Sequence, residues 1–478
     1  MILEHIILYI NLFFFIYMFT YATFVFVNTI VASFHLDDFF IKKKHMGYAM
    51  ITNNQNYMPI SIIVPAYNEE VTILNSITSL LHLQYPDIEI VIVNDGSQDS
   101  TAQKVIEHFH LKEVQRPIRK QVPCKEMDSI YENVFKGKRI VLVNKENGGK
   151  SDALNMGINV SRYPLFICMD ADSVLQYDSL EKIVIPFMES DDVVAVGGNI
   201  KVANQAVIKN GRIEKIVTPK KWLVMFQMIE YFRVFLMSRV AMNGINANLI
   251  ISGAFGLYSK RAVIKVGGYT NGVIGEDMDL VVKLHCFYRK NKLPYQINYI
   301  PDAVCWTQVP ENITVLKAQR KRWHVGMGQA LFSHSFMFFR PSYGTVGMIA
   351  YPYFVLFEYI TPILEILGIV TVVVSYFIHI INLNFLLFYL LFYMGFSLVS
   401  SWVSIVFGNY LYGESLSRKS LVKLMIVAIF ECFGYRQMCS LFRLGAIFGT
   451  RKGKQKWGKM VRVSMDKDKN ESEKPSMH

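Results

Sequence analysis

The chain has 478 residues, of which 52% are hydrophobic and 18% are charged, and its mean hydropathy is +0.26. This composition argues against a disordered chain, a small binding module and a purely soluble globule. The 50 basic residues exceed the 38 acidic ones by 12, an excess that would suit nucleic acid, an anionic membrane face or phosphorylated substrates. The six cysteines form no CxxC pair and no cluster with histidine, which argues against a disulfide scaffold or a zinc site.

An uncharged apolar run opens the chain at residues 6–34. It is longer than the apolar core of a signal peptide and has no basic leader, so it predicts a retained membrane-spanning helix. Lys42, Lys43 and Lys44 follow it closely and place that end on the cytoplasmic side by the positive-inside rule. We therefore predict a transmembrane helix with a basic flank over residues 1–45, followed by a cytosolic domain.

Short β-rich runs alternate with helical runs over residues 58–335, a pattern typical of βαβ units around a largely parallel sheet. We predict one α/β domain here, and it includes the apolar segment 222–242 as a buried or membrane-touching helix. The basic, proline-broken stretch 112–125 is typical of a surface insertion. The predicted strands cover residues 60–64, 88–93, 139–143, 165–169, 193–200 and 250–258.

A second apolar block covers residues 343–448 and predicts membrane spans at 362–380 and 385–407. Charges interrupt its last stretch, 421–448, which favours an interfacial helix or one shielded inside a bundle. The block contains four ionisable residues that could line a polar path across the bilayer. The alternative is that they lie at the level of the lipid headgroups or form ion pairs with one another. They are Glu358, Glu365, Glu431 and Arg436.

Residues 449–478 form a predicted cytosolic tail. It begins with an acid-free basic run directly after the apolar block, where anionic lipid is the natural partner. No recognisable nucleic-acid module accompanies this run, so we expect no nucleic-acid partner. The polar residues 464–478 are predicted to be disordered. The basic run consists of Arg451, Lys452, Lys454, Lys456, Lys459 and Arg462.

Polar residues follow the first two predicted strands, with Glu69 after the first and Asp95 before Gly96 at the end of the second. Ligands of open α/β sheets bind at the carboxyl ends of the strands, where Asp95 would accept hydrogen bonds from a base or ribose. Residues 147–150 form a similar turn, whose amides and Lys150 would suit phosphate at the start of a predicted helix, 151–160. An ordinary turn is the alternative explanation for each of these segments.

Asp170 and Asp172 follow the predicted strand 165–169. Two carboxylates this close repel each other unless a cation or hydrogen-bond donors neutralise them, and carboxylate and phosphate oxygens suit Mg²⁺ or Mn²⁺. We therefore predict a metal site. Further along, Glu276 and Asp277 precede a predicted helix at 280–289, where they either cap the helix dipole or provide Asp277 as a general base.

Gln319, Arg322 and Trp323 lie in a predicted helix, 313–331, at positions i, i+3 and i+4, and therefore share one face. That face offers a cation for a departing diphosphate and an indole ring for a sugar. Contact with lipid headgroups is the alternative explanation for such a basic helix.

These elements, in this order and at these separations, resemble the processive family 2 glycosyltransferases, a group that includes poly-N-acetylglucosamine, hyaluronan, chitin and cellulose synthases. The resemblance covers about residues 59–330 and the flanking membrane segments, and its signal is DxD, then E-D, then QxxRW. It implies a Rossmann-like GT-A domain, cytosolic and flanked by transmembrane and interfacial helices. Residues 275–277 look more like the poly-N-acetylglucosamine and cellulose branches, and we expect no regulatory domain of the cellulose synthase type.

The resemblance also implies a role for each candidate residue. Asp277 would be the catalytic base, and Asp172 with Asp170 would hold Mg²⁺ or Mn²⁺ on the donor diphosphate. Glu69, Asp95 and Lys150 would contact the donor nucleotide. The remaining implied substrate-binding residues are Ser252, Gly253, Glu276, Gln319, Arg320, Arg322 and Trp323, with Asp170 shared between metal and substrate.

The implied activity is inverting transfer of a hexose, with UDP-N-acetylhexosamine as the expected donor, onto a growing β-glycan that the chain itself moves across the plasma membrane. Its implied partners are the nucleotide sugar, the glycan acceptor, the bilayer and a small accessory export subunit. Two other functions stay open at this point. The first is a single-addition transferase with a lipid-linked acceptor, and the second is a non-catalytic scaffold that binds sugar nucleotides.

Overall fold

The computed structural model describes residues 2–45, 57–171, 173–204, 206–209, 212–215, 217–379, 383–411 and 416–447. Asp172, the basic run and the tail that follows it lie outside these residues. The chain divides into two units. Within the described residues, we call them the sheet unit (57–219 and 248–309) and the helical unit (2–45, 220–247 and 310–447). Segments 220–247 and 310–335, which we assigned to the α/β domain, thus cluster with the apolar helices instead.

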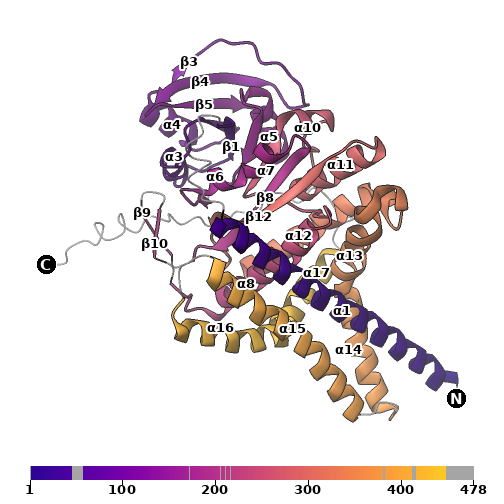
Figure 1. Cartoon of the computed structure of the whole chain (residues 1–478). Coiled ribbons are helices and arrows are strands. Elements are labelled where there is room, and N and C mark those ends of the chain that lie inside the picture. Colours follow the sequence, from indigo (N-terminus) through magenta and orange to yellow (C-terminus); the bar gives the residue numbers. More distant parts are fainter. Residues whose placement is uncertain are drawn as a thin grey trace. The chain divides into compact units, whose positions relative to one another are not determined.

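The sheet unit is built around one mixed ten-stranded sheet (Figure 1). Its central strands are parallel and carry continuous apolar runs, as expected of strands buried on both faces. A separate hairpin pairs β9 (Val207–Lys209) with β10 (Arg212–Lys215). In spatial order the main sheet contains β3 (Lys112–Glu113), β4 (Met127–Phe135), β5 (Lys138–Lys145), β2 (Ile88–Asp95), β1 (Ile60–Ala66), β6 (Leu165–Cys168), β11 (Gly256–Ser259), β8 (Val193–Val202), β12 (Gln296–Thr307) and β7 (Val174–Leu175).

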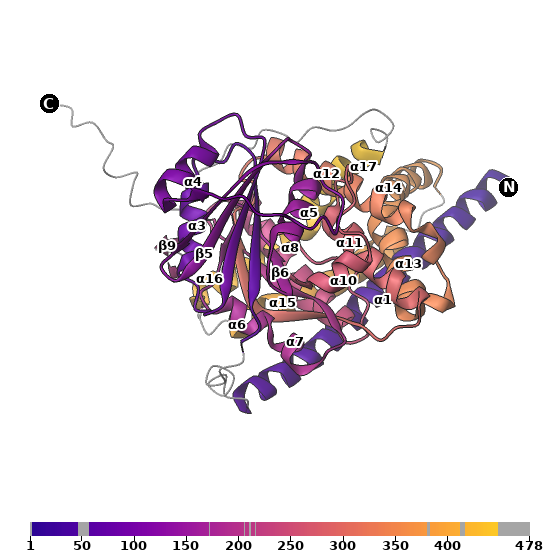
Figure 2. The ribbon, with the colours of Figure 1, turned by 90° about the horizontal axis from the view of Figure 1, so that it is seen from above.

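Helices cover both faces of the parallel strands. Because successive side chains of a strand point to opposite faces, Ile63 and Val91 face a core cluster that α5 (Lys150–Val160), α10 (Lys260–Lys265) and α11 (Glu276–Lys290) complete. Figure 2 shows α3 (Ile73–Leu81) and α4 (Thr101–Phe109) on the opposite side of these strands from α5. The shorter helices α6 (Ser179–Ile183) and α7 (Ile185–Glu189) lie between β7 and β8 in the chain.

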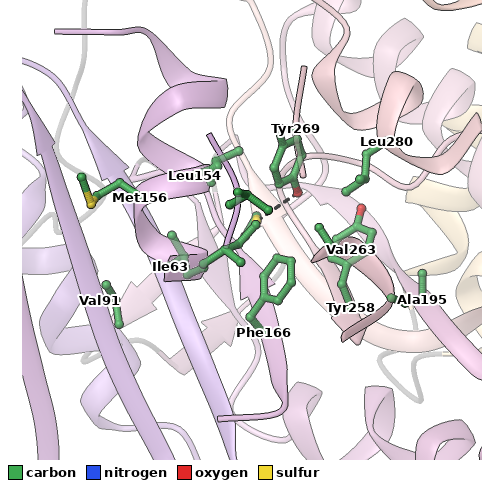
Figure 3. Close-up of a cluster of buried hydrophobic side chains, with 14 of the residues drawn as sticks. Ile63, Val91, Leu154, Met156, Phe166, Ala195, Tyr258, Val263, Tyr269 and Leu280 are labelled. Carbon is green, nitrogen blue, oxygen red and sulfur yellow. Dashed lines mark hydrogen bonds between the residues drawn. The ribbon is translucent and has the colours of Figure 1, made fainter. Parts of the chain in front are cut away.

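The core cluster joins the parallel half of the sheet to the antiparallel strand β11. Phe166 of β6 stacks on Tyr258 of β11, with ring centroids 5.5 Å apart, and the hydroxyl of Tyr269 lies 3.1 Å from the Cys168 sulfur (Figure 3). Burial raises the pKa of the Cys168 thiol to about 12, so this cysteine is a protonated core residue. The packing holds the strand ends that carry the candidate site.

The sequence prediction was incomplete at the sheet's margins. Strand β11 is shorter than the predicted strand 250–258, because residues 250–255 form a loop that turns at Ser252. Strands β4 and β12 were missed: β4 is a half-exposed strand following the predicted insertion, and β12 contains Pro301 at a register shift. Proline is tolerated at such irregularities, although it argues against a strand in the sequence.

The helical unit begins with α1 (Ile2–His45) and continues through α8 (Trp222–Phe232), η1 (Arg233–Ser238) and α9 (Arg239–Asn243). Its central helix is α12 (Ile313–Ser333), which confirms the predicted helix 313–331. The remaining elements are η2 (Ser335–Met337), η3 (Pro341–Tyr343), η4 (Val346–Ala350), α13 (Tyr351–Tyr353), η5 (Phe354–Tyr359), α14 (Thr361–Phe377), α15 (Leu383–Leu411), α16 (Arg418–Phe430), η6 (Glu431–Tyr435) and α17 (Arg436–Ile447).

Among the described residues, three helical segments are long and apolar enough to cross a membrane, namely His5–Lys43, Leu386–Tyr410 and Arg418–Ile447. A fourth is formed if Val346–Tyr359 and Thr361–Phe377, which meet at a bend of 49°, count as one span. These segments contain the predicted span at 6–34 and overlap most of those at 362–380 and 385–407, and residue 380 lies outside the described residues. The segment Arg418–Ile447 is not one continuous helix, because Phe433 and Gly434 adopt non-helical backbone angles.

Two of the acidic side chains within these segments form ion pairs inside the helical unit. The buried Glu431 carboxylate accepts hydrogen bonds from Arg436 at 2.8 and 2.9 Å and from Arg233 at 3.1 and 3.2 Å. Glu358 pairs with Arg443 through its carboxylate and its carbonyl. For these residues the structure shows mutual ion pairing, one of the two explanations that the sequence left open.

The close approach of α5 to β1 depends on Gly157. A Cβ atom at this position would lie 2.3 Å from the Cγ2 atom of Ile63. We expect Gly157→Ala to lower the apparent melting temperature of the full chain, because overpacking costs about 1–3 kcal/mol and outweighs the helix propensity of alanine. Gly395→Ala in α15, whose Cβ would meet no described atom within 4 Å, is the control and should not destabilise. A Gly157→Ala protein that melts at or above the wild-type temperature would contradict this packing.

Candidate active site

An acidic cluster surrounds the side chain of Lys150, the first residue of α5. Its Nζ atom lies 2.7 Å from Oδ1 of Asp170 and 3.0 Å from Oε1 of Glu276, and the side chain is only 13% exposed. Burial alone would lower the pKa of Lys150, but the charges of Asp170, Glu276 and Asp277 outweigh it and raise the pKa. Lys150 is therefore a permanent cation at the carboxyl edge of the sheet.

Asp277 lies beside this cluster in the first turn of α11. Its Oδ2 atom accepts a hydrogen bond from the backbone amide of Gly253 at 3.1 Å, and its Oδ1 atom accepts one from the amide of Met278 at 2.8 Å. A Cβ atom at Gly253 would lie 3.4 Å from Nζ of Lys150 and 3.6 Å from Oδ2 of Asp277, so this loop packs against both side chains. Two backbone amides thus fix the orientation of a half-buried carboxylate next to a cation.

The loop before β11 supplies the Gly253 amide. Phe255 donates its amide to the carbonyl of Ser252 at 3.0 Å, and the amide of Ala254 lies 3.4 Å from the Ser252 hydroxyl. Glu276 closes the cluster from α11 and is buried. Burial raises the pKa of Glu276, the Lys150 charge opposes the rise and the Asp277 charge adds to it. The structure therefore brings five predicted residues together, namely Lys150, Asp170, Gly253, Glu276 and Asp277.

Asp95 lies at the end of β2 and is buried with all its acceptor atoms in use. Its Oδ1 atom accepts hydrogen bonds from Nζ of Lys145 at 2.6 Å and from the amide of Gly148 at 2.9 Å, and its Oδ2 atom accepts the amide of Gly149 at 2.8 Å. The amides that we considered for phosphate binding therefore bind Asp95. For these two amides, the structure shows a turn between strand and helix, the alternative explanation.

Glu69 anchors the turn between β1 and α3. Its Oε2 atom accepts the hydroxyl of Thr72 at 2.7 Å, and its amide donates to the hydroxyl of Thr101 at 2.8 Å. Glu69 is 5% exposed. This geometry shapes the carboxyl edge of the sheet, and direct contact of Glu69 with a nucleotide stays a prediction.

The sequence analysis missed Lys145 and Asp152. Nζ of Lys145 lies 2.6 Å from Oδ1 of Asp95 and 2.7 Å from Oδ1 of Asp152, and all three side chains are buried. Burial lowers the pKa of Lys145, but hydrogen bonds and charges from Asp152 and Asp95 outweigh it and raise the pKa. The signal in the sequence was a lysine at the end of an apolar strand. The parallel register with β2, which pairs Lys145 with Asp95, comes from the structure.

The QxxRW residues lie on α12 in the helical unit. The guanidinium of Arg320 is buried, donates two hydrogen bonds to Glu230 at 2.7 and 2.8 Å, and lies 4.6 Å from the centre of the Trp323 ring. Trp323 itself is 42% exposed, and Arg322 is half-buried. Gln319 places its Oε1 atom in the interior, where no described atom hydrogen bonds to it. Arg320 therefore holds Trp323 in place, and substrate contact by these four residues stays a prediction.

The structure describes one of the two predicted metal ligands, Asp170. Asp170 follows β6, and its side chain is 35% exposed with one oxygen on Lys150. A partly exposed carboxylate at this edge fits one ligand of a hard divalent cation. Within the described part of the chain, which omits Asp172, no three His, Cys, Asp or Glu side chains are grouped to hold a metal ion. The donor set fits a cation that Asp170, Asp172 and diphosphate oxygens would share.

Comparison with protein families decides the nature of this domain. Residues 61–267 match the model of glycosyl transferase family 2, and residues 165–396 match that of glycosyl transferase family group 2. This domain belongs to glycosyltransferase family 2. The family 2 domain has the mixed sheet and the flanking helices of the GT-A fold, as the sequence predicted.

Two curated relatives are similar to this chain over part of its length. The chain is 32% identical over 313 residues to a poly-beta-1,6-N-acetyl-D-glucosamine synthase of Staphylococcus epidermidis, a match that spans 65% of either chain. It is 31% identical over 306 residues to the synthase of Staphylococcus aureus strain COL, across 64% of this chain and 62% of that one. The match thus spans somewhat less than two thirds of the length of these relatives.

Solved structures give weaker likenesses. The mannosyltransferase PcManGT of Pyrobaculum calidifontis, solved with GDP-Man and Mn²⁺, is 15% identical with a TM-score of 0.49, over 89% of this chain and 99% of that one. S. aureus TarS is 15% identical with a TM-score of 0.35, over 58% of this chain and 39% of that one. Similarity at this level assigns no function.

Removal of the Lys150 charge tests the acidic cluster. We expect Lys150→Met to lower the melting temperature more at pH 8 than at pH 5, because burial and the Asp277 charge raise the pKa of Glu276, the Lys150 charge that opposes this rise is lost, and acid neutralises the buried carboxyl. The matched control is Lys182→Met, since Lys182 is also 13% exposed and, among the described residues, has Asp178 at 2.6 Å as its one ion-pair partner. Equal pH dependence of the two variants in thermal unfolding would contradict the cluster's role.

Proposed function

We propose that this protein is a membrane-embedded inverting hexosyltransferase that polymerises sugar from UDP-N-acetylhexosamine into an extracellular β-glycan and moves the product across the plasma membrane. The observation that carries the proposal is the position of the Asp277 carboxylate. It is fixed by the amides of Gly253 and Met278 and lies in the cluster of Lys150, Asp170 and Glu276. A general base next to groups that hold a diphosphate is the arrangement that glycosyl transfer needs.

In this proposal Asp277 removes the proton from the acceptor hydroxyl while that oxygen forms a bond to the anomeric carbon of the donor. The bond from that carbon to the diphosphate breaks on the opposite side, which inverts the anomeric configuration. Lys150 stabilises the charge that develops on the departing diphosphate. Asp170 and Asp172 would hold Mg²⁺ or Mn²⁺, which supplies further positive charge to the diphosphate when bound.

Polymerisation and export are supported by the helical unit and by the relatives. Three to four apolar segments of the described chain can cross a membrane, and QxxRW lies in the same unit. Trp323 keeps 42% of its surface exposed, a stable surface on which a sugar ring can stack. The relatives' name supports an N-acetylglucosamine polymer as the product. The lysines at the end of α1 support a cytoplasmic location of the family 2 domain.

The base assignment is tested by Asp277→Asn. We expect this variant to bind the sugar nucleotide as the wild type does and to lose transfer by about 10²–10⁴-fold, the usual contribution of a general base. Asp279→Asn in the same helical turn is the control, because Asp279 is buried and accepts the Thr270 hydroxyl at 2.6 Å. It should retain transfer within a few-fold. Substantial turnover by a folded Asp277→Asn protein, measured as released nucleotide, would exclude Asp277 as the base.

Product length distinguishes polymerisation from single addition. Purified full-length protein should convert labelled UDP-N-acetylglucosamine into a ladder of long chains, and linkage-specific hydrolases should degrade them. Chelation by EDTA should stop synthesis, and added Mg²⁺ or Mn²⁺ should restore it. A product in which a lipid acceptor carries one added sugar would contradict polymerisation and favour a single-addition transferase. Nucleotide binding without any transfer would favour a non-catalytic scaffold.

A further inference from the structure

A buried ion cluster lies beside the candidate active site, at the carboxyl ends of β2 and β5. The parallel register places Asp95 opposite Lys145, and the ammonium of Lys145 bridges Asp95 at 2.6 Å and Asp152 at 2.7 Å. The three side chains are 5%, 0% and 3% exposed in the order Asp95, Lys145, Asp152. Burial of three charges is costly, and apolar residues of similar volume often serve stability equally well. Their presence here therefore requires an explanation other than stability.

The cluster holds the turn that precedes α5. Asp95 accepts the amides of Gly148 and Gly149, while Asp152, in the first turn of the helix, accepts the amide of Lys125 at 3.1 and 3.2 Å. A Cβ atom at Gly148 would lie 2.6 Å from Cγ of Asp152, so the turn packs directly on the cluster. The turn is thus fixed from both sides, and Lys145 is the cation that holds the two carboxylates together.

The turn ends at Lys150, the cation of the candidate active site. Gly149 has a φ of +88°, a conformation that glycine adopts without strain, and Lys150 begins the helix directly after it. From this backbone position the Lys150 side chain reaches Asp170 and Glu276. A shift of the turn would move the Lys150 backbone and misplace its ammonium relative to both carboxylates.

We propose that Lys145 is a positioning residue for donor binding. By holding Asp95 and Asp152 together, it fixes residues 147–149 and thereby aims the Lys150 ammonium at the site where the diphosphate of a nucleotide sugar binds. Lys145 itself does not contact the donor. The inference rests on the proposed function for the identity of the ligand, a nucleoside diphosphate sugar.

The test compares Lys145→Met with Arg139→Met in the full-length chain in lipid nanodiscs. Arg139 is the control because it lies at the opposite end of β5, is 13% exposed and pairs with Glu89 and Glu132. Its removal therefore also breaks ion pairs that are largely buried. With UDP-N-acetylglucosamine and Mg²⁺ as the probe, Lys145→Met should raise the donor KM and Kd by about 10–100-fold, the usual effect of losing a group that orients a ligand-binding residue. Its kcat at saturating donor should fall far less than that of Asp277→Asn, because the base is untouched and a displaced Lys150 weakens only the stabilisation of the departing diphosphate. Arg139→Met should lose thermal stability and keep the wild-type donor KM.

A double variant, Lys145→Met with Asp152→Asn, separates positioning from folding. It removes one carboxylate together with the cation, which relieves the charge imbalance and should restore thermal stability relative to Lys145→Met. The donor KM should stay raised, because the ion bridge that joins Asp95 to Asp152 of α5 is still absent. The inference about Lys145 would be overturned if both variants had the wild-type donor KM. The proposed function would stand in that case, provided that the wild type binds and turns over the donor. A wild-type chain that binds no sugar nucleotide would overturn the proposed function, and this inference with it.

Discussion

The neutralisation of carboxylates by two lysines is the constraint on which the sheet unit's functional edge depends. Parallel strands bring their polar ends to one edge, and there Asp95, Asp152, Asp170, Glu276 and Asp277 converge. Such a group cannot ionise in a protein interior without cations close by. Lys145 forms ion pairs with the buried Asp95 and Asp152, and Lys150 forms them with the more exposed Asp170 and Glu276. Each of these four carboxylates therefore has a defined position. The cost is that the geometry of the site depends on a few side chains.

The helical unit follows the same rule with arginines. Arg320 binds Glu230 through two hydrogen bonds, and Arg233 and Arg436 together enclose Glu431. Arginine suits these places because its planar guanidinium matches a carboxylate with two parallel hydrogen bonds. These pairs explain how a strongly apolar set of helices accommodates charge. They also hold the interrupted segment at Phe433 and Gly434 next to α8 and η1, which lie far away in the sequence.

The sequence predicted the central strands and the main helices because their signals are local. Continuous apolar runs followed by polar turns predict β1, β2, β5 and β6, and the residues that end them were correctly placed at one edge. Strand β12 escaped prediction because Pro301 sits in a register shift that only its pairing with β8 reveals. Segments 220–247 and 310–335 group with the helical unit through long-range contacts, such as that between Arg233 and Glu431, which lie some 200 residues apart.

The site shows the same division. Lys150, Asp170 and Asp277 were predicted from short motifs, and the structure places them together. Lys145 could not be predicted, because its importance depends on the register of β5 against β2 and on the position of Asp152 in α5. The amides of Gly148 and Gly149 were assigned from the turn's position alone, and only the orientation of Asp95 shows where they donate.

The most direct test is an experimental structure of the full-length protein with a bound, unreactive UDP-sugar analogue and Mn²⁺. We expect density for the diphosphate next to Lys150, Mn²⁺ shared between the diphosphate and the carboxylates of Asp170 and Asp172, and the anomeric carbon facing Asp277. A donor bound elsewhere, or bound with Asp277 facing away from the sugar, would contradict the proposed function.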